Sequence, residues 1–416
     1  MLSKKFIISE ANSAWFNRVI KASDGGYVAV GYVTGYDPDG AGPEIKYDPI
    51  TYTDNNGDSQ TDYIGSPLIV KLDAGGNHVW HKVFRYYTAA TKDPATERIY
   101  NDASFSDVVE VSDGYVAVGS YDVNQHRSAT NSDGDDATPT DALILKTTTT
   151  GTVTYHKQVD VPSTSTSQAS KYLSAVNTTS AGAIIAGGTD DSRELIQKFA
   201  GSGGFSNTFS QLFRYSVSFF TITDPSDVSQ IYEVIGGTDL VTMTMYIKPL
   251  SFFSNAIHRV NSTATANVWA KRYDFNLISI LPRGSLVSDG GYIAASMTAG
   301  GTNYDYHVVK TDTNGDTPLS GCPANSFSPT ALAGPSTFAD PYYNSWSGTP
   351  GSDVISITRT SITLLTAFVC TKTICTPPAA ATTVTASQNP ICEGQSTTIF
   401  ASGPATDVTY YVYTTP

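Results

Sequence analysis

The amino-acid sequence predicts an all-β protein whose first three-quarters is a β-propeller of four-stranded blades, five favoured and six as the alternative. Three features predict this fold: a strand-favouring composition, a recurring four-strand pattern, and an N-terminal strand that could complete the last copy. Only 15% of the 416 residues are charged, and Thr, Ser, Gly, Asn and Tyr are abundant. β-Branched and aromatic residues pack well on pleated sheets, and Gly, Asn and Asp suit tight hairpins.

The first two copies of the pattern match closely. Asp-Gly-Gly-Tyr at 24–27 matches Asp-Gly-Tyr at 113–115, and Lys71 matches Lys146. The strands expected in the first copy are Phe16–Ala22, Tyr27–Val33, Leu68–Asp73 and His78–Phe84. Those expected in the second are Phe105–Val111, Tyr115–Ser120, Ala142–Thr147 and Val153–Val159.

Three further copies follow. The third is expected at Tyr172–Thr178, Ala183–Gly188, Glu194–Phe199 and Phe209–Phe213. The fourth is expected at Gln230–Ile235, Leu240–Ile247, Ala256–Val260 and Val268–Tyr273. The fifth has Ser285–Val287, a strand from Tyr292 and Tyr306–Thr311, but no fourth strand.

The N-terminal segment Lys4–Ile8 resembles the missing fourth strand. If it pairs beside Tyr306–Thr311, it closes the ring and removes exposed sheet edges. A sixth blade could lie within 327–369, and an open β-solenoid is the architectural alternative, although solenoid repeats are usually shorter.

Three regions are expected along the chain. Residues 1–321 form the propeller, 322–378 a divergent cysteine-containing β segment and linker or an extra blade, and 379–416 the beginning of an incomplete Ig-like β-sandwich. The four cysteines all lie in the last quarter and lack the paired CxxC pattern of metal sites. A bridge from Cys322 to Cys370 or Cys375 is plausible in an oxidising compartment, and Cys392 is the fourth cysteine.

Charge and hydropathy exclude some partners. A formal net charge of -13 without a basic stripe argues against nucleic acid, which requires clustered Lys and Arg. No apolar stretch is long enough to span a membrane, and the N-terminus lacks a signal-peptide core. The chain is therefore expected to begin after a removed signal or to be a fragment.

The strand order predicts two unlike edges of the sheets. Asp-Gly and Asn-Gly hairpins emerge at one edge, and the long connections 36–67, 85–104, 121–141 and 214–228 emerge at the other. Loops carry binding functions more often than scaffolds do, so the long-loop edge is the candidate binding surface. The alternative is that these loops merely vary in length.

Two long loops contain Asp and Asn clusters that suit calcium, the one cofactor that the sequence suggests. Alternating Asp and Asn in a Gly-containing loop can direct several oxygens at Ca²⁺, although ordinary Asx-turns explain the same residues and neither loop has the full EF-hand pattern. The candidate ligands are Asp54, Asn56, Asp58, Asp62, Asn131, Asp133 and Asp135.

Tyrosines in the first long loop are candidates for sugar binding, because their rings present a large apolar face with a polar tip. Alternatively they fix the loop against the scaffold. They are Tyr36, Tyr47, Tyr52 and Tyr63.

The sequence predicts no catalytic residues. No Ser or Cys lies in a nucleophile-elbow pattern, and no Gly-rich phosphate loop joins a strand to a helix. His81 and His156 occupy equivalent repeat positions, which favours a structural role. A glycan-cleaving propeller enzyme is the alternative, because paired carboxylates distant in sequence can meet in space.

Two segments of the repeat, at 23–31 and 69–82, resemble propeller-like repeats of large secreted surface proteins of the Bacteroidetes group. The segments 389–398 and 411–415 resemble the opening of Ig-like modules in such proteins, including gliding adhesins exported by the type IX system. The resemblance implies an extracellular, cell-surface adhesin, exported across the outer membrane, that binds a glycan or surface protein. It also implies further Ig-like modules downstream. A structural module of a surface filament is another alternative.

Overall fold

A computed structural model describes the β-strands of this chain and most of its tight turns. The described residues are 4–7, 13–34, 50–53, 59–62, 65–87, 103–122, 140–160, 171–190, 193–201, 206–214, 225–248, 252–273, 278–300, 303–317, 324–327, 330–333, 337–339, 342–346, 351–354, 383–386 and 399–402. Within these ranges all regular structure is β-strand. The all-β prediction is therefore confirmed.

Five antiparallel sheets follow one another along the chain, and each begins with one copy of the sequence pattern. Sheet 1 contains β2 (Ser13–Lys21), β3 (Tyr27–Thr34), β6 (Gly65–Leu72) and β7 (His78–Tyr87). Sheet 2 contains β8 (Ala103–Val111), β9 (Gly114–Asp122), β10 (Thr140–Thr148) and β11 (Val153–Asp160). Sheet 3 contains β12 (Lys171–Thr178), β13 (Ile184–Asp190), β14 (Arg193–Phe199) and β15 (Asn207–Arg214).

The fourth copy forms a similar sheet and the fifth a smaller one. Sheet 4 contains β16 (Pro225–Glu233), β17 (Leu240–Lys248), β18 (Phe252–Val260) and β19 (Asn267–Tyr273). Sheet 5 contains only β20 (Ile278–Leu286), β21 (Tyr292–Gly300) and β22 (Asn303–Lys310). The four-strand pattern is thus confirmed for four copies, and the fifth has three paired strands, as its sequence indicates.

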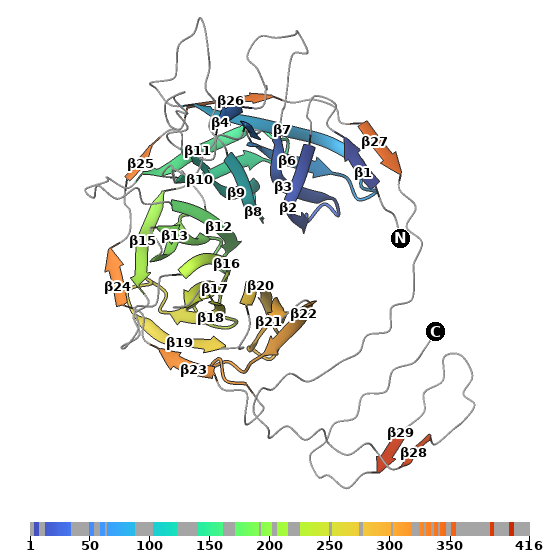
Figure 1. The fold of residues 1–416 in the computed structure, drawn as a ribbon, viewed down its shortest axis with the longest axis vertical. Coiled ribbons are helices and arrows are strands. Elements are labelled where there is room, and N and C mark those ends of the chain that lie inside the picture. Colours follow the sequence, from blue (N-terminus) through green and yellow to red (C-terminus); the bar gives the residue numbers. More distant parts are fainter. Residues whose placement is uncertain are drawn as a thin grey trace, which may run out of the picture. The chain divides into compact units, whose positions relative to one another are not determined.

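Five short strands near the C-terminus form a strap, defined here as β23–β27. They are β23 (Ala324–Phe327), β24 (Thr330–Ala333), β25 (Thr337–Ala339), β26 (Tyr342–Trp346) and β27 (Gly351–Val354). β23, β24, β25 and β26 pair in turn with β19, β15, β11 and β7, the fourth strands of sheets 4, 3, 2 and 1. In Figure 1 these orange strands lie along the outer edges of the sheets. The described part of 322–378 therefore adds a fifth strand to existing sheets, and its strands do not pair with one another to make a sixth.

The N-terminal strand has an unexpected partner. β1 (Lys4–Ile7) pairs with β27, with Lys4 opposite Val354. No pairing between β1 and the expected Tyr306–Thr311 region is present among the described residues, where β22 pairs only with β21. Closure of the ring by β1 thus does not appear among the strand pairings.

Two smaller pairs complete the strand pairing. β4 (Ile50–Thr53) and β5 (Ser59–Asp62) form a hairpin within the long connection of sheet 1. β28 (Thr383–Ala386) pairs with β29 (Ile399–Ser402). The chain divides into one compact unit of residues 1–318 and 323–361 and another of 319–322 and 362–416, which contains β28 and β29.

Apolar clusters between successive sheets form the core of the larger unit. The first cluster joins residues of sheets 1 and 2, such as Ile69 and Phe105, and the next joins Val116 of sheet 2 to Leu173 of sheet 3. Equivalent clusters join sheets 3 and 4, and sheets 4 and 5. Each internal sheet is therefore apolar on both faces, which explains why its central strands read as nearly continuous hydrophobic runs.

An ion pair explains the lysine that recurs in the third strand of the repeat. Lys71 lies 2.8 Å from Asp24 of the Asp-Gly turn, and Lys146 lies 2.9 Å from Asp113. The same pair recurs in sheet 5 and, with Arg in place of Lys, in sheet 4; its members are Lys310 with Asp289 and Arg259 with Asp239. The third strand and the first turn are thus joined in four of the five sheets.

A tryptophan in the fourth strand contacts the next sheet. Trp80 donates a 2.9 Å hydrogen bond to the Thr149 carbonyl, and its ring lies against the positive-φ Gly151. Trp269 lies in the same way against Gly315 of sheet 5. Both rings also contact the tyrosine that follows the first turn of the next sheet, Tyr115 or Tyr292. The aromatic residue of the repeat therefore joins neighbouring sheets.

Candidate functional site

Most residues predicted from the sequence to bind ligands lie outside the described residues. These are Tyr36, Tyr47, Tyr63, Asp54, Asn56, Asp58, Asn131, Asp133 and Asp135. Tyr52 lies on β4 and Asp62 on β5, so the backbone of one hairpin carries one residue of each predicted set. Among the described residues no three His, Cys, Asp or Glu side chains are grouped to hold a metal ion. Calcium binding stays a prediction for the long loops.

A polar cluster lies on the first strands of the sheets, at a repeated β-bulge. In sheets 1 to 4 the register shifts after Phe16, Phe105, Leu173 and Val228, and in sheet 5 after Ile280. A bulge redirects side chains and bends the strand locally. At or beside the bulges lie the polar side chains of Arg18, Asp107, Ser174, Ser229 and Arg283.

Asp107 is the centre of this cluster. Its buried carboxylate accepts hydrogen bonds from the backbone N–H of Val108, at 2.9 Å, and of Val176 in sheet 3, at 3.0 Å. Arg18 of sheet 1 lies 3.0 Å from it. Burial raises the pKa of Asp107, and the positive charges of Arg18 and Arg283 oppose that rise. One carboxylate thus connects the first strands of sheets 1, 2 and 3.

Further hydrogen bonds connect the first strands of sheets 3, 4 and 5. Ser174 donates to the Val228 carbonyl at 2.5 Å, and Arg283 donates to the Ser229 carbonyl at 3.2 Å. The Tyr232 hydroxyl lies 2.6 Å from the Gly284 carbonyl. Most polar groups at the bulges therefore bind neighbouring sheets, which indicates a structural role for this cluster.

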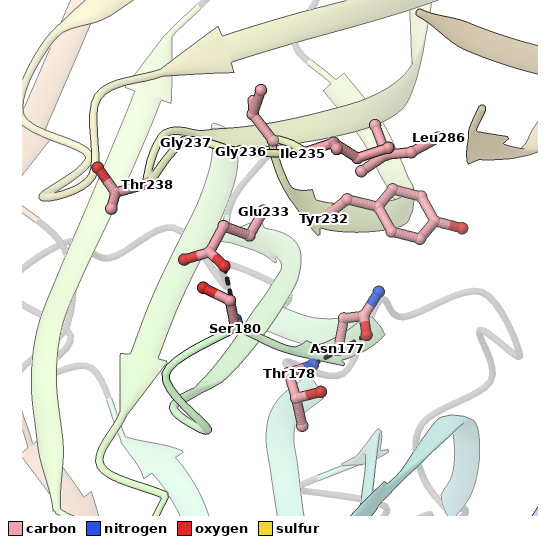
Figure 2. Close-up of a pocket in the computed structure, with 11 residues that line it drawn as sticks. Asn177, Thr178, Ser180, Tyr232, Glu233, Ile235, Gly236, Gly237, Thr238 and Leu286 are labelled. Carbon is pink, nitrogen blue, oxygen red and sulfur yellow. Dashed lines mark hydrogen bonds between the residues drawn. The ribbon is translucent and has the colours of Figure 1, made fainter. Parts of the chain in front are cut away.

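An open hollow of about 640 Å³ lies at the hairpin edge of sheets 3, 4 and 5 (Figure 2). Glu233 accepts a 2.6 Å hydrogen bond from the Ser180 backbone N–H, and the side chains of Tyr232 and Leu286 lie on the other side. Ile235, on the turn above, is 53% exposed. The hollow combines one carboxylate, hydroxyls and a few apolar side chains.

The position of the hollow was not predicted, because the sequence directed attention to the opposite edge. Val234 and Ile235 were expected to continue a strand, but β16 ends at Glu233 and both residues lie in the turn. The sequence signal for this turn was the pair Gly236 and Gly237 after the apolar residues, because a Gly-Gly pair favours a turn.

Buried histidines connect sheets. His258 lies 2.6 Å from Glu194 across the interface of sheets 4 and 3, and both side chains are fully buried. The second carboxylate oxygen of Glu194 accepts a hydrogen bond from Thr242. His156 of sheet 2 lies 2.6 Å from the Tyr86 hydroxyl of sheet 1. Their buried, inter-sheet positions agree with a structural role for His156 and extend it to His258.

No protein-family model matches the chain, and no curated protein matches it. The part of the chain that the structure describes contains no helix that could cross a membrane.

Proposed function

We propose that this protein is an extracellular, cell-surface binding protein of adhesin type, in which a β-sheet scaffold presents long loops to a glycan or surface protein. One observation carries the proposal: the two edges of the sheets differ in the length of their connections. At one edge, sheet 2 turns within two residues between Val111 and Gly114. At the other, the chain runs from Thr34 to Gly65 between β3 and β6.

The long connections gather on sheets 1 to 3. They leave β3, β7, β9, β11 and β15, whereas two residues separate β13 from β14 in sheet 3 and β21 from β22 in sheet 5 at the same edge. Loops on a rigid scaffold can vary without destabilising its core, which suits them to recognition. The binding surface is therefore assigned to the long-loop edge of sheets 1 and 2 and the adjoining part of sheet 3.

The same proposal includes a five-bladed propeller, and the order of the strap supports it. The partners of β23, β24, β25 and β26 are the fourth strands of sheets 4, 3, 2 and 1. β27 continues this series and pairs with β1. In a ring the next position after sheet 1 is sheet 5, which has three strands, so β1 is assigned as its fourth strand and β27 as its fifth.

Other parts of the proposal rest on the sequence. The segment that resembles an Ig-like module includes the antiparallel pair β28 and β29. Export across the outer membrane by a type IX system, and further Ig-like modules downstream, follow from the resemblance of 389–398 and 411–415.

Loop replacement tests the binding function. We expect a chain with residues 35–64 replaced by a short Gly-Ser linker to keep its strand content and lose attachment to immobilised polysaccharides or glycoproteins that bind the natural chain. The matched control is Ile235→Ser, which changes the hollow at the opposite edge. Attachment that survives the loop replacement but is lost in the control would move the site to the hollow. Attachment that survives both changes would contradict both locations.

The enzyme alternative predicts a different pattern. Incubation with the same polysaccharides would release products, and one or two carboxylate substitutions would abolish release while the loop replacement would not. Glu233 is the first carboxylate to substitute, because it lines the open hollow, whereas the buried Asp107 is held by two backbone N–H groups and by Arg18.

A further inference from the structure

Sheet 1 exposes apolar side chains at positions that the other sheets bury. Phe16 is 45% exposed, Val19 57% and Tyr27 37%. Their counterparts, aligned through the bulge and the first turn, are at most 6% exposed, and each is covered by the preceding sheet. These counterparts are Phe105, Val108 and Tyr115 in sheet 2, Leu173, Val176 and Ile184 in sheet 3, and Val228, Ile231 and Leu240 in sheet 4.

Sheet 5 exposes the complementary face. Ile293 of β21 is 37% exposed and Val308 of β22 is 60% exposed. Their counterparts in the other sheets pack against the following sheet and are at most 3% exposed. They are Val28 and Ile69, Val116 and Ile144, Ile185 and Ile196, and Val241 and Ile257.

We propose that the apolar face of sheet 5, with Ile293 and Val308, packs against Phe16, Val19 and Tyr27 of sheet 1 in the same chain. This contact would repeat the interface that joins every other pair of neighbouring sheets. It rests on the ring that we propose above and names the side chains that would close it. Burial of apolar area would favour the contact.

Two observations favour the chain's own sheet 5 over a second copy. Arg283 of sheet 5 lies close enough to Asp107 of sheet 2 for its charge to oppose the rise in pKa that burial causes. Arg18 of sheet 1 acts in the same way on Tyr232 of sheet 4, whose pKa burial raises. The first strands of sheets 1 and 5 therefore lie near the same polar cluster. The strap, which ends on β1, also holds the N-terminal strand within the same unit.

A charge-pair experiment on the full chain tests this contact without using ligand binding. Val19→Lys and Val308→Glu would each place a charge in the proposed interface, so each should lower the melting temperature by at least about 4 °C. The double variant should recover part of the loss, because opposite charges would meet. Val268→Lys and Val79→Glu are the matched controls, since both valines are about as exposed but lie on fourth strands. The controls should leave the melting temperature nearly unchanged.

The outcomes separate closure from its alternatives. Recovery in the double variant, with a monomeric mass by light scattering at all protein concentrations, supports closure within one chain. Single variants that melt like the controls would overturn it. Recovery that appears only together with a mass that grows with concentration would assign the contact to head-to-tail association of copies. If a charged variant fails to fold, Val19→Thr and Val308→Thr replace the pair, and melting temperatures equal to that of the natural chain would again overturn closure. Loss of glycan attachment would bear only on the proposed binding function.

Discussion

Replacement of Gly315 by alanine should destabilise the protein more than replacement of Gly182, although both are turn glycines with similar φ, +74° and +78°. Left-handed backbone costs an L-residue about 1–2 kcal/mol, and this cost is common to both substitutions. The surroundings differ. A Cβ on Gly182 would have no heavy atom within 4 Å, whereas a Cβ on Gly315 would lie 2.7 Å from the Trp269 ring.

The steric contact sets the size of the difference. Overpacking costs about 1–3 kcal/mol, so Gly315→Ala should lower the free energy of unfolding by about 2–5 kcal/mol and Gly182→Ala by about 1–2 kcal/mol. Urea unfolding followed by circular dichroism measures both. Gly236→Ala, with φ +71° and no neighbour within 4 Å, is a second control. In a Trp269→Ala background most of the extra loss at Gly315 should disappear, because the remaining close neighbour is the flexible side chain of Lys271, 3.1 Å away. Equal losses at Gly315 and Gly182 would refute the assigned contact between the tryptophan and the next sheet.

Three further predictions concern titration and buried polar contacts. The hydrogen bond from Lys71 lowers the pKa of Asp24 below 3.8. The stabilising contribution of this hydrogen bond is therefore complete above pH 3.8 and is lost as the pH falls through the pKa of Asp24 in the folded protein. In NMR titration, Lys71→Met should return the pKa of Asp24 toward 3.8. Burial raises the pKa of Tyr115 from 10.0 to about 12, so stability should fall as the pH rises from 10 to about 12, and ultraviolet titration of the tyrosinate should show a group that ionises only near 12. Glu194→Ala removes the carboxylate 2.6 Å from the fully buried His258, so it should lower the free energy of unfolding in urea by about 3–5 kcal/mol. Glu194→Gln keeps a hydrogen-bonding group and should lower it by less. Equal losses in the two variants would contradict this explanation.

The repeated sheets could be predicted from the sequence because their signals are local. Turns rich in Gly, Asp, Ser and Thr, flanked by alternating or continuous apolar residues, predicted nearly all strands of sheets 1 to 4, with ends that differ by a few residues. The sequence shows that Lys71 recurs at Lys146, and the structure shows that each of these lysines pairs with the Asp of the first turn.

The strap and the polar cluster could not be predicted for a different reason. Strands of three to five residues, such as Thr337–Ala339, carry too little periodicity to be recognised, and their partners are far away in the sequence. The bulges shift the register by one or two residues. A Gly lies opposite the bulge in sheets 1 to 3, namely Gly31, Gly119 and Gly188, but a Gly in a strand does not identify the partner residue that bulges. From the sequence, Arg18 and Asp107 are therefore indistinguishable from ordinary strand residues, and only the structure shows that they form an ion pair.

The reversed order of the strap has a consequence for the time course of folding. Ala270 pairs with Phe327, but Lys4 pairs with Val354, so the sequence separation of the strap pairings grows from β23 to β27. Once β23 has docked, β24 lies near its partner, and each later strand is delivered to the adjacent sheet by a short connection. The cost of loop closure therefore falls mainly on the first step. Sheet 1 is synthesised first, yet among sheets 1 to 4 it is the last to pair with a strand of the strap. β1 can pair with β27 only after some 350 further residues have been synthesised. We therefore expect the strap strands to complete their pairing slowly.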